Sequence, residues 1–323
     1  MSVQLRPLGN SGLLVSPVAL GCWPIAGMTS LGVTDEDSRA TITAAVEAGI
    51  NFLDTAYIYG TAGQSEKLIG EMIVGQRDKL IIATKGGIHW DAKGDRAFDG
   101  SRATIHRECR ESLRRLKIDV VDLYYLHAPD PNLPIEESAA AIAELKTAGL
   151  IRAAAVSNVS VDQLQRFQAV CPVAAVQPPY NMLQRQIEAD LVPYCLEHNI
   201  GLCIYWPLLK GLLAGKLARD HVFQPGDGRP KYPMFQGQEW ERNQDLLDDL
   251  RAIARDAGKT VPQLVVQWTI AQPGITSALC GAKRPDQILE SAAALQDEIT
   301  PEQLGRIEVA LAKRGPAITR TAV

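Results

Sequence analysis

Four polar residues in the first half of the chain have the types that a proton-donating carbonyl-reduction site needs. Asp54 ends a short apolar run, and Tyr59 follows five residues later in a turn. Lys85 and His127 each come directly after a further apolar run. Apolar runs of this length are typical of strands, so three strands would each end at an ionisable residue. We expect these strand ends to share one rim, where the four side chains meet.

Reduction of an aldehyde or ketone needs a hydride at carbon, a proton at oxygen and stabilisation of the developing alkoxide. A tyrosine has an ordinary pKa of roughly 10, so it keeps its proton at neutral pH and releases it only if the phenolate is stabilised. We predict Tyr59 as the acid, Lys85 as the cation that stabilises the phenolate, and Asp54 as the anchor of Lys85. His127 would bind and orient the substrate oxygen.

Each of the four residues has a simpler interpretation when it is taken singly. Asp54 could cap a helix or turn, and Tyr59 could be a rim aromatic. Lys85 could be an exposed charge, and His127 a structural histidine. Their joint occurrence favours the site, because catalytic residues of parallel barrels gather at the carboxyl ends of the strands. A catalytic metal is not expected, since only one of the five histidines follows a strand.

The composition is that of a soluble globular chain that binds a small molecule. Its 323 residues are 46% hydrophobic and 22% charged, which allows a sizeable core. A net charge of −4 and a pI near 5.8 disfavour nucleic acid or an anionic membrane as a partner, because either would select a basic face. No signal peptide and no run of about 18 apolar residues occurs, so we expect a cytoplasmic protein without a membrane segment.

The cysteines indicate reduced core residues rather than a disulfide framework. All six are scattered, mostly inside apolar runs, and no C-x-x-C pair occurs. Cys22 alone falls near the expected rim, where a small filler side chain is favoured over a reactive thiol.

Short Val, Ile, Leu and Ala runs alternate eight times with longer stretches of helical periodicity. The expected strands cover residues 18–21, 51–54, 80–84, 121–126, 152–156, 173–177, 201–205 and 275–280. The expected helices cover residues 34–48, 64–74, 101–117, 135–148, 160–169, 186–199, 241–257 and 285–296. Strands that are apolar throughout are buried on both faces, as in a parallel sheet covered by helices. Eight such units predict a closed (β/α)8 TIM barrel.

Further segments complete this architecture. The tetrapeptide Gly9-Asn-Ser-Gly12 predicts an N-terminal β-hairpin that closes the barrel floor. Segments 86–100 and 206–240 are too long for ordinary connections, and we expect large loops over the mouth of the barrel, where the strands have their carboxyl ends. Thr300-Pro-Glu-Gln begins an extra C-terminal helix. No linker or low-complexity tract occurs, so we expect one domain over residues 1–323.

A doubly wound open sheet would give a similar count of elements. Such a sheet normally carries the dinucleotide-binding pattern G-x-G-x-x-G after its first strand. Here the first strand is followed by Gly21-Cys-Trp-Pro-Ile-Ala-Gly27, which is a different pattern. The barrel is therefore favoured.

Several motifs, in order along nearly the whole chain, resemble those of the aldo-keto reductase family. They are Gly49-Ile-Asn-Phe-Leu-Asp-Thr-Ala-Tyr-Ile-Tyr-Gly60 with Ser65-Glu66, Ala83-Thr-Lys85, Asp122-Leu-Tyr-Tyr-Leu-His127, Ala155-Val-Ser-Asn158, Gln177 with Tyr180-Asn181, Tyr205-Trp-Pro-Leu-Leu-Lys-Gly-Leu-Leu-Ala-Gly-Lys216 and Gly281-Ala-Lys-Arg-Pro-Asp-Gln287. The chain most resembles the bacterial branch with long loops. The resemblance implies a (β/α)8 barrel that binds NADPH or NADP+ without the Rossmann pattern, and it carries the same four roles onto the four polar residues above.

The resemblance also implies a set of cofactor-binding residues. Ser157, Asn158 and Gln177 would hydrogen-bond the nicotinamide carboxamide. Tyr205 would stack on the nicotinamide ring, and the segment 206–211 would wrap the pyrophosphate together with Lys216. The whole implied set is Gly21, Trp23, Asp54, Ser157, Asn158, Gln177, Tyr205, Trp206, Pro207, Leu208, Lys210, Gly211, Lys216, Gly281, Lys283, Arg284, Gln287, Glu290 and Ser291.

The adenosine end of the cofactor is expected where the last barrel helix begins, near Pro285. Helix N-termini favour phosphate, and this barrel often binds phosphate after its last strands. Lys283 and Arg284 add positive charge there, which suits the 2′-phosphate of NADPH. The resemblance then implies contacts to adenosine from three residues of that helix, Gln287, Glu290 and Ser291.

Two positions depart from the family pattern. Trp206 stands where many members carry Ser or Gly, so only main-chain contacts to phosphate remain there. Ser291 stands where Asn is common, which weakens the implied contact to adenine.

Aromatic residues in the expected loops indicate which kind of substrate the pocket would accept. Aromatic residues of the loops are candidate pocket walls, namely Trp23, Tyr57, Trp90, Tyr232 and Phe235. Such a mouth favours aldehydes as substrates, and either a monomer or a homo-oligomer is compatible with the sequence. A non-catalytic NADPH-sensing subunit, resembling potassium-channel beta subunits, is the alternative function. Those subunits tend to replace the histidine that this chain keeps at His127.

Overall fold

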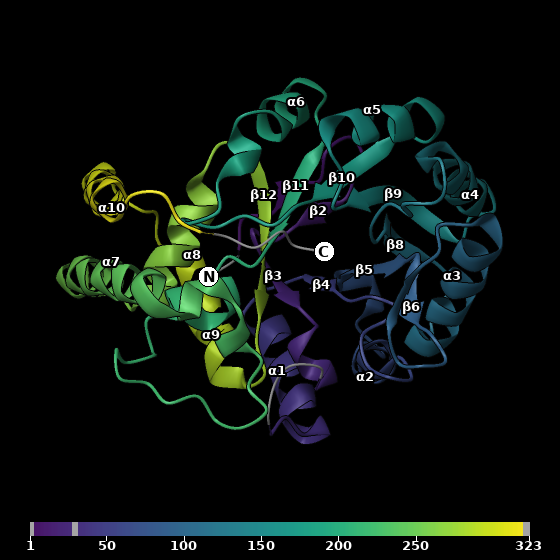
Figure 1. Ribbon diagram of the computed structural model, residues 1–323. Coiled ribbons are helices and arrows are strands. Elements are labelled where there is room, and N and C mark those ends of the chain that lie inside the picture. Colours follow the sequence, from purple (N-terminus) through teal and green to yellow (C-terminus); the bar gives the residue numbers. More distant parts are fainter. Residues whose placement is uncertain (1–2, 28–31, 319–323) are drawn as a thin grey trace.

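Eight parallel strands form a closed barrel in the computed structural model, which describes residues 3–27 and 32–318 (Figure 1). Going round the barrel, the strands are β3 (Val18–Gly21), β4 (Phe52–Asp54), β5 (Ile81–Gly86), β8 (Val121–Leu126), β9 (Ile151–Ser157), β10 (Val173–Gln177), β11 (Gly201–Tyr205) and β12 (Ile275–Gly281). The predicted (β/α)8 fold is therefore confirmed. The predicted single domain over 1–323 includes residues 1–2, 28–31 and 319–323, which lie outside the described residues.

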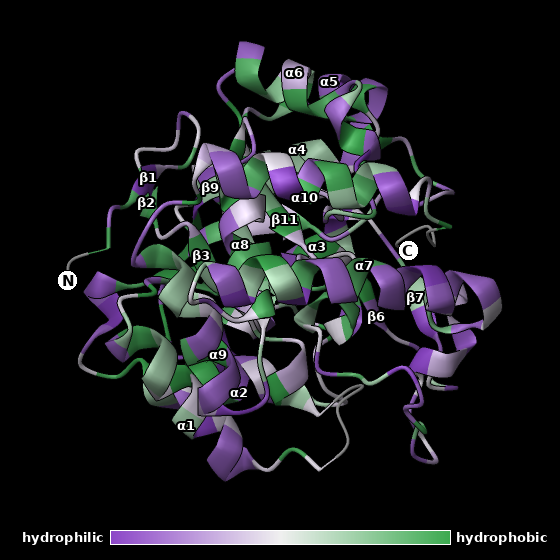
Figure 2. Ribbon diagram, turned by 90° about the vertical axis from the view of Figure 1, so that its left-hand side faces the viewer, coloured by the Kyte–Doolittle hydropathy of each residue, from purple (hydrophilic) through white to green (hydrophobic). Residues whose placement is uncertain are grey.

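The strands are apolar throughout because both of their faces are covered. In β3, Ala19 packs among the side chains that fill the barrel interior, whereas Val18 and Leu20 pack against outer helices. Alanines make up much of the interior layer, which leaves room for the larger Phe52 and Tyr125. In Figure 2 the strands are largely green, and hydrophilic purple stretches lie on outer helices. Continuous hydrophobic runs thus report two-sided burial, as expected for a parallel sheet.

Ten α-helices lie in the described residues, and four of them begin at a capping box. Their bounds are α1 (Asp35–Glu47), α2 (Gln64–Met72), α3 (Arg102–Leu116), α4 (Ile135–Thr147), α5 (Val161–Val170), α6 (Leu191–Glu197), α7 (Gly237–Asp256), α8 (Val261–Ala271), α9 (Pro285–Ala292) and α10 (Pro301–Arg314). The capping boxes of α1, α5, α8 and α10 begin at Thr34, Ser160, Thr260 and Thr300. No helix among the described residues is both long and apolar enough to cross a bilayer.

The helix expected over residues 241–257 is present as α7, but a further helix, α8, was not expected from the sequence. We expected residues 241–257 to form the barrel helix before the last strand, but α8 packs against β12 in that place. The corresponding helix, α7, instead packs against α10 beside the barrel (Figure 1). The residues of α8 are apolar on most sides and include Pro262, so they show little helical periodicity. The predicted C-terminal helix is confirmed as α10.

The N-terminal hairpin closes the barrel floor, as expected. Strands β1 (Arg6–Pro7) and β2 (Leu14–Val15) pair antiparallel, and the side chains of Leu8 and Leu13 are buried with the barrel interior. Gly9 lies in this turn with φ of 50°, and a Cβ there would come within 2.4 Å of the Ala174 main-chain oxygen. A side chain is therefore excluded at this position.

A second hairpin, which the sequence did not predict, lies within the expected loop 86–100. It consists of β6 (Ile88–Trp90) and β7 (Arg96–Phe98), paired antiparallel. Strands of three residues are too short to show the alternation of apolar and polar residues by which a hairpin is recognised in a sequence. The other expected loop, 206–240, contains short 3-10 helices, which are η4 (Leu209–Ala214), η5 (Arg229–Lys231) and η6 (Pro233–Phe235).

Candidate active site

The four polar residues converge on one rim because three neighbouring parallel strands end there. Asp54 is the last residue of β4, Lys85 lies near the end of β5, and His127 directly follows β8. The chain after β4 continues to pair with β5, since the main-chain N–H of Tyr57 donates to the oxygen of Lys85 at 3.0 Å. This pairing brings the loop that carries Tyr59 over the lysine.

Lys85 is fully buried and makes an ion pair with Asp54. Its Nζ atom donates to Asp54 Oδ1 at 2.5 Å and to the main-chain oxygen of Thr55 at 2.7 Å. The other carboxylate oxygen of Asp54 accepts from Gln177 Nε2 at 2.9 Å. Burial disfavours the ammonium, but the charge of Asp54 and the hydrogen bonds to Asp54 and Tyr59 outweigh burial and raise the pKa of Lys85. Lys85 is therefore favoured as an ammonium, although it has no solvent contact.

Tyr59 lies directly against this cation. The Lys85 Nζ atom is 5.1 Å from the centroid of the phenol ring. Burial raises the pKa of Tyr59, and the charge of Lys85, together with its hydrogen bonding to the phenol, opposes that rise. Tyr59 thus keeps its proton at neutral pH, and Lys85 is the group that favours its release.

His127 lies beside the phenol as a neutral ring. The two ring centroids are 6.0 Å apart at an interplanar angle of 70°. Burial lowers the pKa of His127 well below its ordinary value, and the positive charges of Lys85 and Arg96 add to this effect. Its Nδ1 atom is buried and has no hydrogen-bond partner among the described residues. A neutral imidazole can donate one hydrogen bond and accept one.

The residues implied for the carboxamide are gathered on the neighbouring strand ends. Asn158 donates from Nδ2 to the main-chain oxygen of His127 at 2.9 Å and accepts from the Tyr205 hydroxyl at 2.7 Å. The Ser157 hydroxyl donates to the main-chain oxygen of Gln177 at 2.8 Å. Together these contacts join the ends of β8, β9, β10 and β11. They also fix the main chain at His127.

The segment 206–211 has an unusual main-chain conformation. Trp206, Leu209 and Lys210 have φ angles of 63°, 43° and 55°, in the left-handed region that non-glycine residues rarely adopt. Gly211 follows with φ of 86°. Such strained main chain clusters at ligand-binding sites. Between these positions lie the other two residues implied for phosphate, Pro207 and Leu208.

Gly21 and Gly281 face each other across the pairing of β3 and β12. A Cβ at Gly21 would lie 3.5 Å from the main-chain nitrogen of Gly281, which is ordinary van der Waals contact.

Helix α9 and the loop after β11 are joined by an ion pair. Lys216 Nζ lies 2.5 Å from Glu290 Oε2. At the start of α9, the N-cap residue is Arg284, and no side chain caps the helix. Gln287 accepts from the main-chain N–H of Lys283 at 2.9 Å. One turn further, Ser291 donates from Oγ to the main-chain oxygen of Gln287 at 3.2 Å. The residues implied for adenosine thus lie on one face of α9 and in the loop that precedes this helix.

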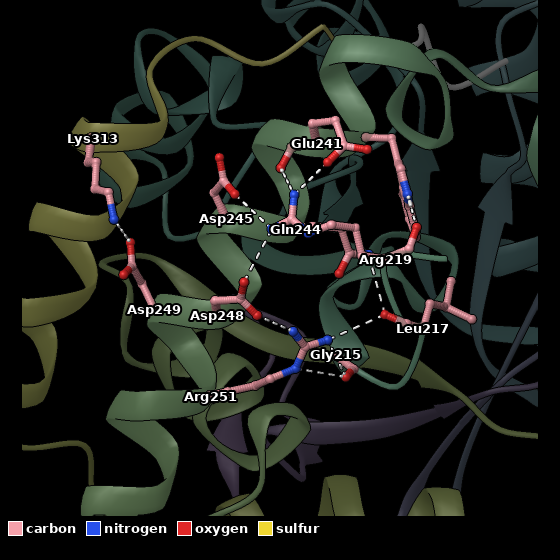
Figure 3. A network of polar contacts seen from close by, with 11 residues as sticks. Gly215, Leu217, Arg219, Glu241, Gln244, Asp245, Asp248, Asp249, Arg251 and Lys313 are labelled. Carbon is pink, nitrogen blue, oxygen red and sulfur yellow. Dashed lines mark hydrogen bonds and ion pairs between the residues drawn. The ribbon is translucent and has the colours of Figure 1, made fainter. Parts of the chain in front are cut away.

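The loop that contains Lys216 is held by a polar network on α7 (Figure 3). Arg251 Nη2 donates to the main-chain oxygens of Gly215 at 2.9 Å and Leu217 at 3.3 Å. Arg219 pairs with three carboxylates of α7, those of Glu241, Asp245 and Asp248. This network was not expected from the sequence. The acidic residues of α7 recur three and four positions apart, which places them on one helix face. This spacing is the sequence signal from which the network could have been predicted.

Of the five aromatic candidates for the pocket, Trp23 and Trp90 lie beside Tyr59. The Trp23 ring packs edge-on against Tyr59, with centroids 4.9 Å apart. Trp90 Nε1 donates to the main-chain oxygen of Ile58 at 3.0 Å, next to Tyr59. Arg96, which the sequence analysis missed with its hairpin, lies 5.7 Å from the centroid of the Trp23 ring.

Tyr57 and Phe235 make contacts away from Tyr59, and Tyr232 lies beside the segment 206–211. The Tyr57 hydroxyl donates to Glu111 of α3 at 2.6 Å, so this side chain turns toward the outer helices. Phe235 is buried in an aromatic cluster with Phe223 and Trp240. Tyr232 lies under the ammonium of Lys210, beside the strained segment.

The cysteines are all buried and none forms a disulfide. Cys22 donates from Sγ to the main-chain oxygen of Leu20 at 3.4 Å. Burial raises the pKa of the Cys22 thiol, and the charge of Asp54 adds to the rise. A raised pKa favours the protonated thiol over the nucleophilic thiolate at this position. Among the described residues, no three His, Cys, Asp or Glu side chains form a group that could hold a metal ion.

A model of the Aldo/keto reductase family matches residues 17–312. Aldo-keto reductase YhdN of Bacillus subtilis (strain 168) is 40% identical over 290 residues, which are 88% of this chain and 87% of that protein. The NADH-specific methylglyoxal reductase of Escherichia coli (strain K12) is 34% identical over 305 residues, 90% of this chain and 92% of that protein. The solved structure of glycerol dehydrogenase AKR11B4 from Gluconobacter oxydans aligns with a TM-score of 0.90 at 36% identity, covering 99% of this chain and 98% of that chain.

Proposed function

Because the chain belongs to the aldo/keto reductase family, we propose that it reduces an aldehyde or ketone to an alcohol with NADPH, using Tyr59 as the general acid. The observation that carries this proposal is the buried Lys85, held at 2.5 Å from Asp54 and 5.1 Å from the phenol ring of Tyr59. A lysine without a role in the site, placed at a strand end, would be expected to extend into solvent. A buried cation against a phenol has a direct use, since it stabilises the phenolate that proton donation leaves behind.

Each residue of the tetrad has a step to perform. When bound, a reduced nicotinamide cofactor supplies the hydride that adds to the carbonyl carbon. Tyr59 gives its proton to the carbonyl oxygen as the double bond is reduced, and the resulting phenolate is stabilised by Lys85. Asp54 keeps Lys85 charged and directed at the phenol. The proton that Tyr59 loses is replaced from solvent after the alcohol leaves.

His127 is suited to orient the substrate rather than to donate the proton. Its ring is neutral, because burial and nearby cations hold its pKa far below neutrality. Since Nδ1 is buried without a partner, the tautomer with its proton on Nε2 would direct the single N–H at the carbonyl oxygen. A neutral donor stabilises the developing charge without competing with Tyr59 for the role of acid.

The residues of the rim fit a nicotinamide dinucleotide. At one end, the amides of Asn158 and Gln177 and the hydroxyl of Ser157 suit the carboxamide, and the ring of Tyr205 suits stacking on the nicotinamide. At the other end, the strained main chain of 206–211 and the uncapped start of α9 suit phosphate groups. These two groups of residues lie on neighbouring strand ends of one rim, as an extended cofactor requires.

Preference for NADPH is supported by the two cations that precede α9. Lys283 and Arg284 add positive charge next to an uncapped helix start, which would favour the additional phosphate of NADPH. The Escherichia coli relative is named as NADH-specific. The two cofactors therefore have to be compared directly.

The test is a panel of aromatic, aliphatic and sugar-derived aldehydes and ketones, incubated with the purified protein and either NADPH or NADH. Loss of cofactor absorbance and formation of the alcohol are measured together. We expect turnover with several aldehydes and a higher kcat/KM with NADPH. Binding of cofactor without turnover of any carbonyl compound would contradict the proposal and favour a regulatory subunit. Equal kcat/KM with both cofactors would contradict the preference alone.

A further inference from the structure

An arginine lies at the mouth of the barrel, one aromatic ring away from the proposed acid. Arg96 belongs to β7, and its guanidinium carbon is 5.7 Å from the centroid of the Trp23 ring. The same ring packs edge-on against Tyr59 with centroids 4.9 Å apart. The positive charge also reaches the imidazole of His127, whose pKa it helps to lower. A substrate bound at the acid would therefore meet this cation.

The position of Arg96 is fixed by the hairpin that carries it. Arg96 pairs with Trp90 across the hairpin, and the Trp90 indole donates to the main-chain oxygen of Ile58. The root of the hairpin is held by Glu108, whose Oε2 accepts from the Gly87 main-chain N–H at 2.7 Å. The hairpin is thus tied to the loop of Tyr59 at one point and to helix α3 at another.

The guanidinium has no carboxylate partner in the described part of the chain. Among the described residues, no carboxylate oxygen of an aspartate or glutamate lies within 4.0 Å of a guanidinium nitrogen of Arg96. By contrast, Arg39, Arg166 and Arg219 each form ion pairs on the surface. Arginine presents its N–H donors in a planar fork that matches a carboxylate. A fork that stacks on Trp23 and lacks an internal anion can donate to an external one.

We propose that Arg96 selects carbonyl substrates that carry a carboxylate at a distance from the reacting carbon, a preference that rests on the reductase function proposed above. A carboxylate fits better than a phosphate ester, because one planar fork satisfies one carboxylate, whereas a phosphate carries more charge than a single arginine neutralises. The aldehyde or ketone would lie against Tyr59, and the carboxylate would extend past Trp23 toward the hairpin.

Two aldehydes of the same shape test this preference. In 4-carboxybenzaldehyde and 4-nitrobenzaldehyde the para substituents are planar groups of similar size, and only the former is charged. The measured quantity is the kcat/KM for 4-carboxybenzaldehyde divided by the kcat/KM for 4-nitrobenzaldehyde. It is determined with NADPH and with NADH, in the wild type and in Arg96→Met. Loss of a charge-assisted hydrogen bond should lower this ratio by about tenfold, whereas Arg96→Lys should keep more of it.

A charge-matched control separates local contact from general attraction. Lys93 lies exposed in the turn of the same hairpin, so Lys93→Met removes the same charge without touching the Trp23 ring. We expect this variant to change the ratio by less than about twofold, because a solvent-exposed charge is screened. A ratio that falls equally in both variants, or in neither, would overturn the proposal for Arg96 while leaving the reductase function intact. If the wild type reduces neither aldehyde nor any compound of the panel, the reductase function fails and this inference fails with it.

Discussion

Arg115 of α3 donates a hydrogen bond from Nη1 to the main-chain oxygen of Tyr57 at 3.1 Å, two residues before Tyr59. The same atom lies 3.0 Å from Glu66, which is fully buried and also accepts from the Thr84 hydroxyl at 2.6 Å. Thr84 directly precedes Lys85 in β5. One ion pair, whose carboxylate is buried, thus connects the loop of the proposed acid with the strand of its cationic partner.

Replacing Arg115 should destabilise the protein and reduce kcat more than it changes KM. In Arg115→Met the carboxylate of Glu66 stays buried without its cation, which costs about 3 kcal/mol of unfolding free energy. The loop of Tyr59 also loses a main-chain contact, so the acid is positioned less well. Urea unfolding and steady-state kinetics measure the two effects.

The double variant Arg115→Met with Glu66→Gln is the control for this prediction. Removing the uncompensated charge should restore part of the lost unfolding free energy, whereas kcat should stay low because the contact to Tyr57 is still absent. If the double variant recovers kcat together with stability, Arg115 does not position the acid.

Protonation of His127 should make stability depend on pH in a defined direction. In the folded state its pKa lies well below the ordinary value, whereas in the unfolded state it is about 6.5. Below about pH 6.5 the unfolded state therefore binds a proton that the folded state does not. The free energy of unfolding should fall as the pH falls, by at most about 1.4 kcal/mol per pH unit from this residue.

Comparison with His127→Asn isolates this contribution, since asparagine cannot titrate. The variant should lose less unfolding free energy than the wild type between about pH 7 and about pH 5. The lowered pKa of His127 is contradicted if the variant loses as much unfolding free energy as the wild type over this range.

Glu108 should produce the opposite pH dependence. Burial raises the pKa of Glu108 to about 8, from an ordinary value of 4.5. Between these values the folded state binds a proton that the unfolded state has released, so this contribution is present at low pH and is lost as the pH rises toward 8. Glu108→Gln should therefore gain unfolding free energy relative to the wild type as the pH increases over this range.

Urea titrations at several pH values measure this trend, with Glu137→Gln on the exposed face of α4 as the control. A constant difference between Glu108→Gln and the wild type across the range would show that the buried carboxyl is ionised throughout.

Removing the two cations before α9 should affect NADPH more than NADH. Only NADPH carries the additional phosphate, and a charge-assisted hydrogen bond contributes about 1.5 kcal/mol or more. The double variant Lys283→Ala with Arg284→Ala should raise the KM for NADPH by about tenfold or more and change that for NADH much less. Equal changes in both KM values would place the 2′-phosphate elsewhere.

Much of this architecture could be predicted from the sequence because two-sided burial leaves a clear pattern. The continuous apolar strands place Asp54, Lys85 and His127 at strand ends, and the observed strand bounds agree within two residues. The helix that was missed, α8, is apolar on most sides, so its periodicity is weak. A hydrophobic pattern indicates which face of a helix is buried. It is least informative for a helix that is buried on every face.

The remaining features depend on contacts between distant segments. Arg96 was missed because its hairpin is too short to show alternation, and Arg115 because nothing in its own helix points to the loop of Tyr59. The positions of Tyr57 and Phe235 were likewise open, since an aromatic residue in a loop packs equally well against a helix or into a core.

The substitution Tyr59→Phe tests the central claim most directly, because it removes one oxygen and leaves the ring that packs against Trp23. Binding of NADPH to the variant, measured by fluorescence titration, should stay within about threefold of the wild type. Turnover of an aldehyde that the wild type reduces should fall by at least about 100-fold, as expected for loss of a general acid. A variant that binds NADPH and still reduces the aldehyde at a rate near that of the wild type would contradict the assignment of Tyr59 as the proton donor.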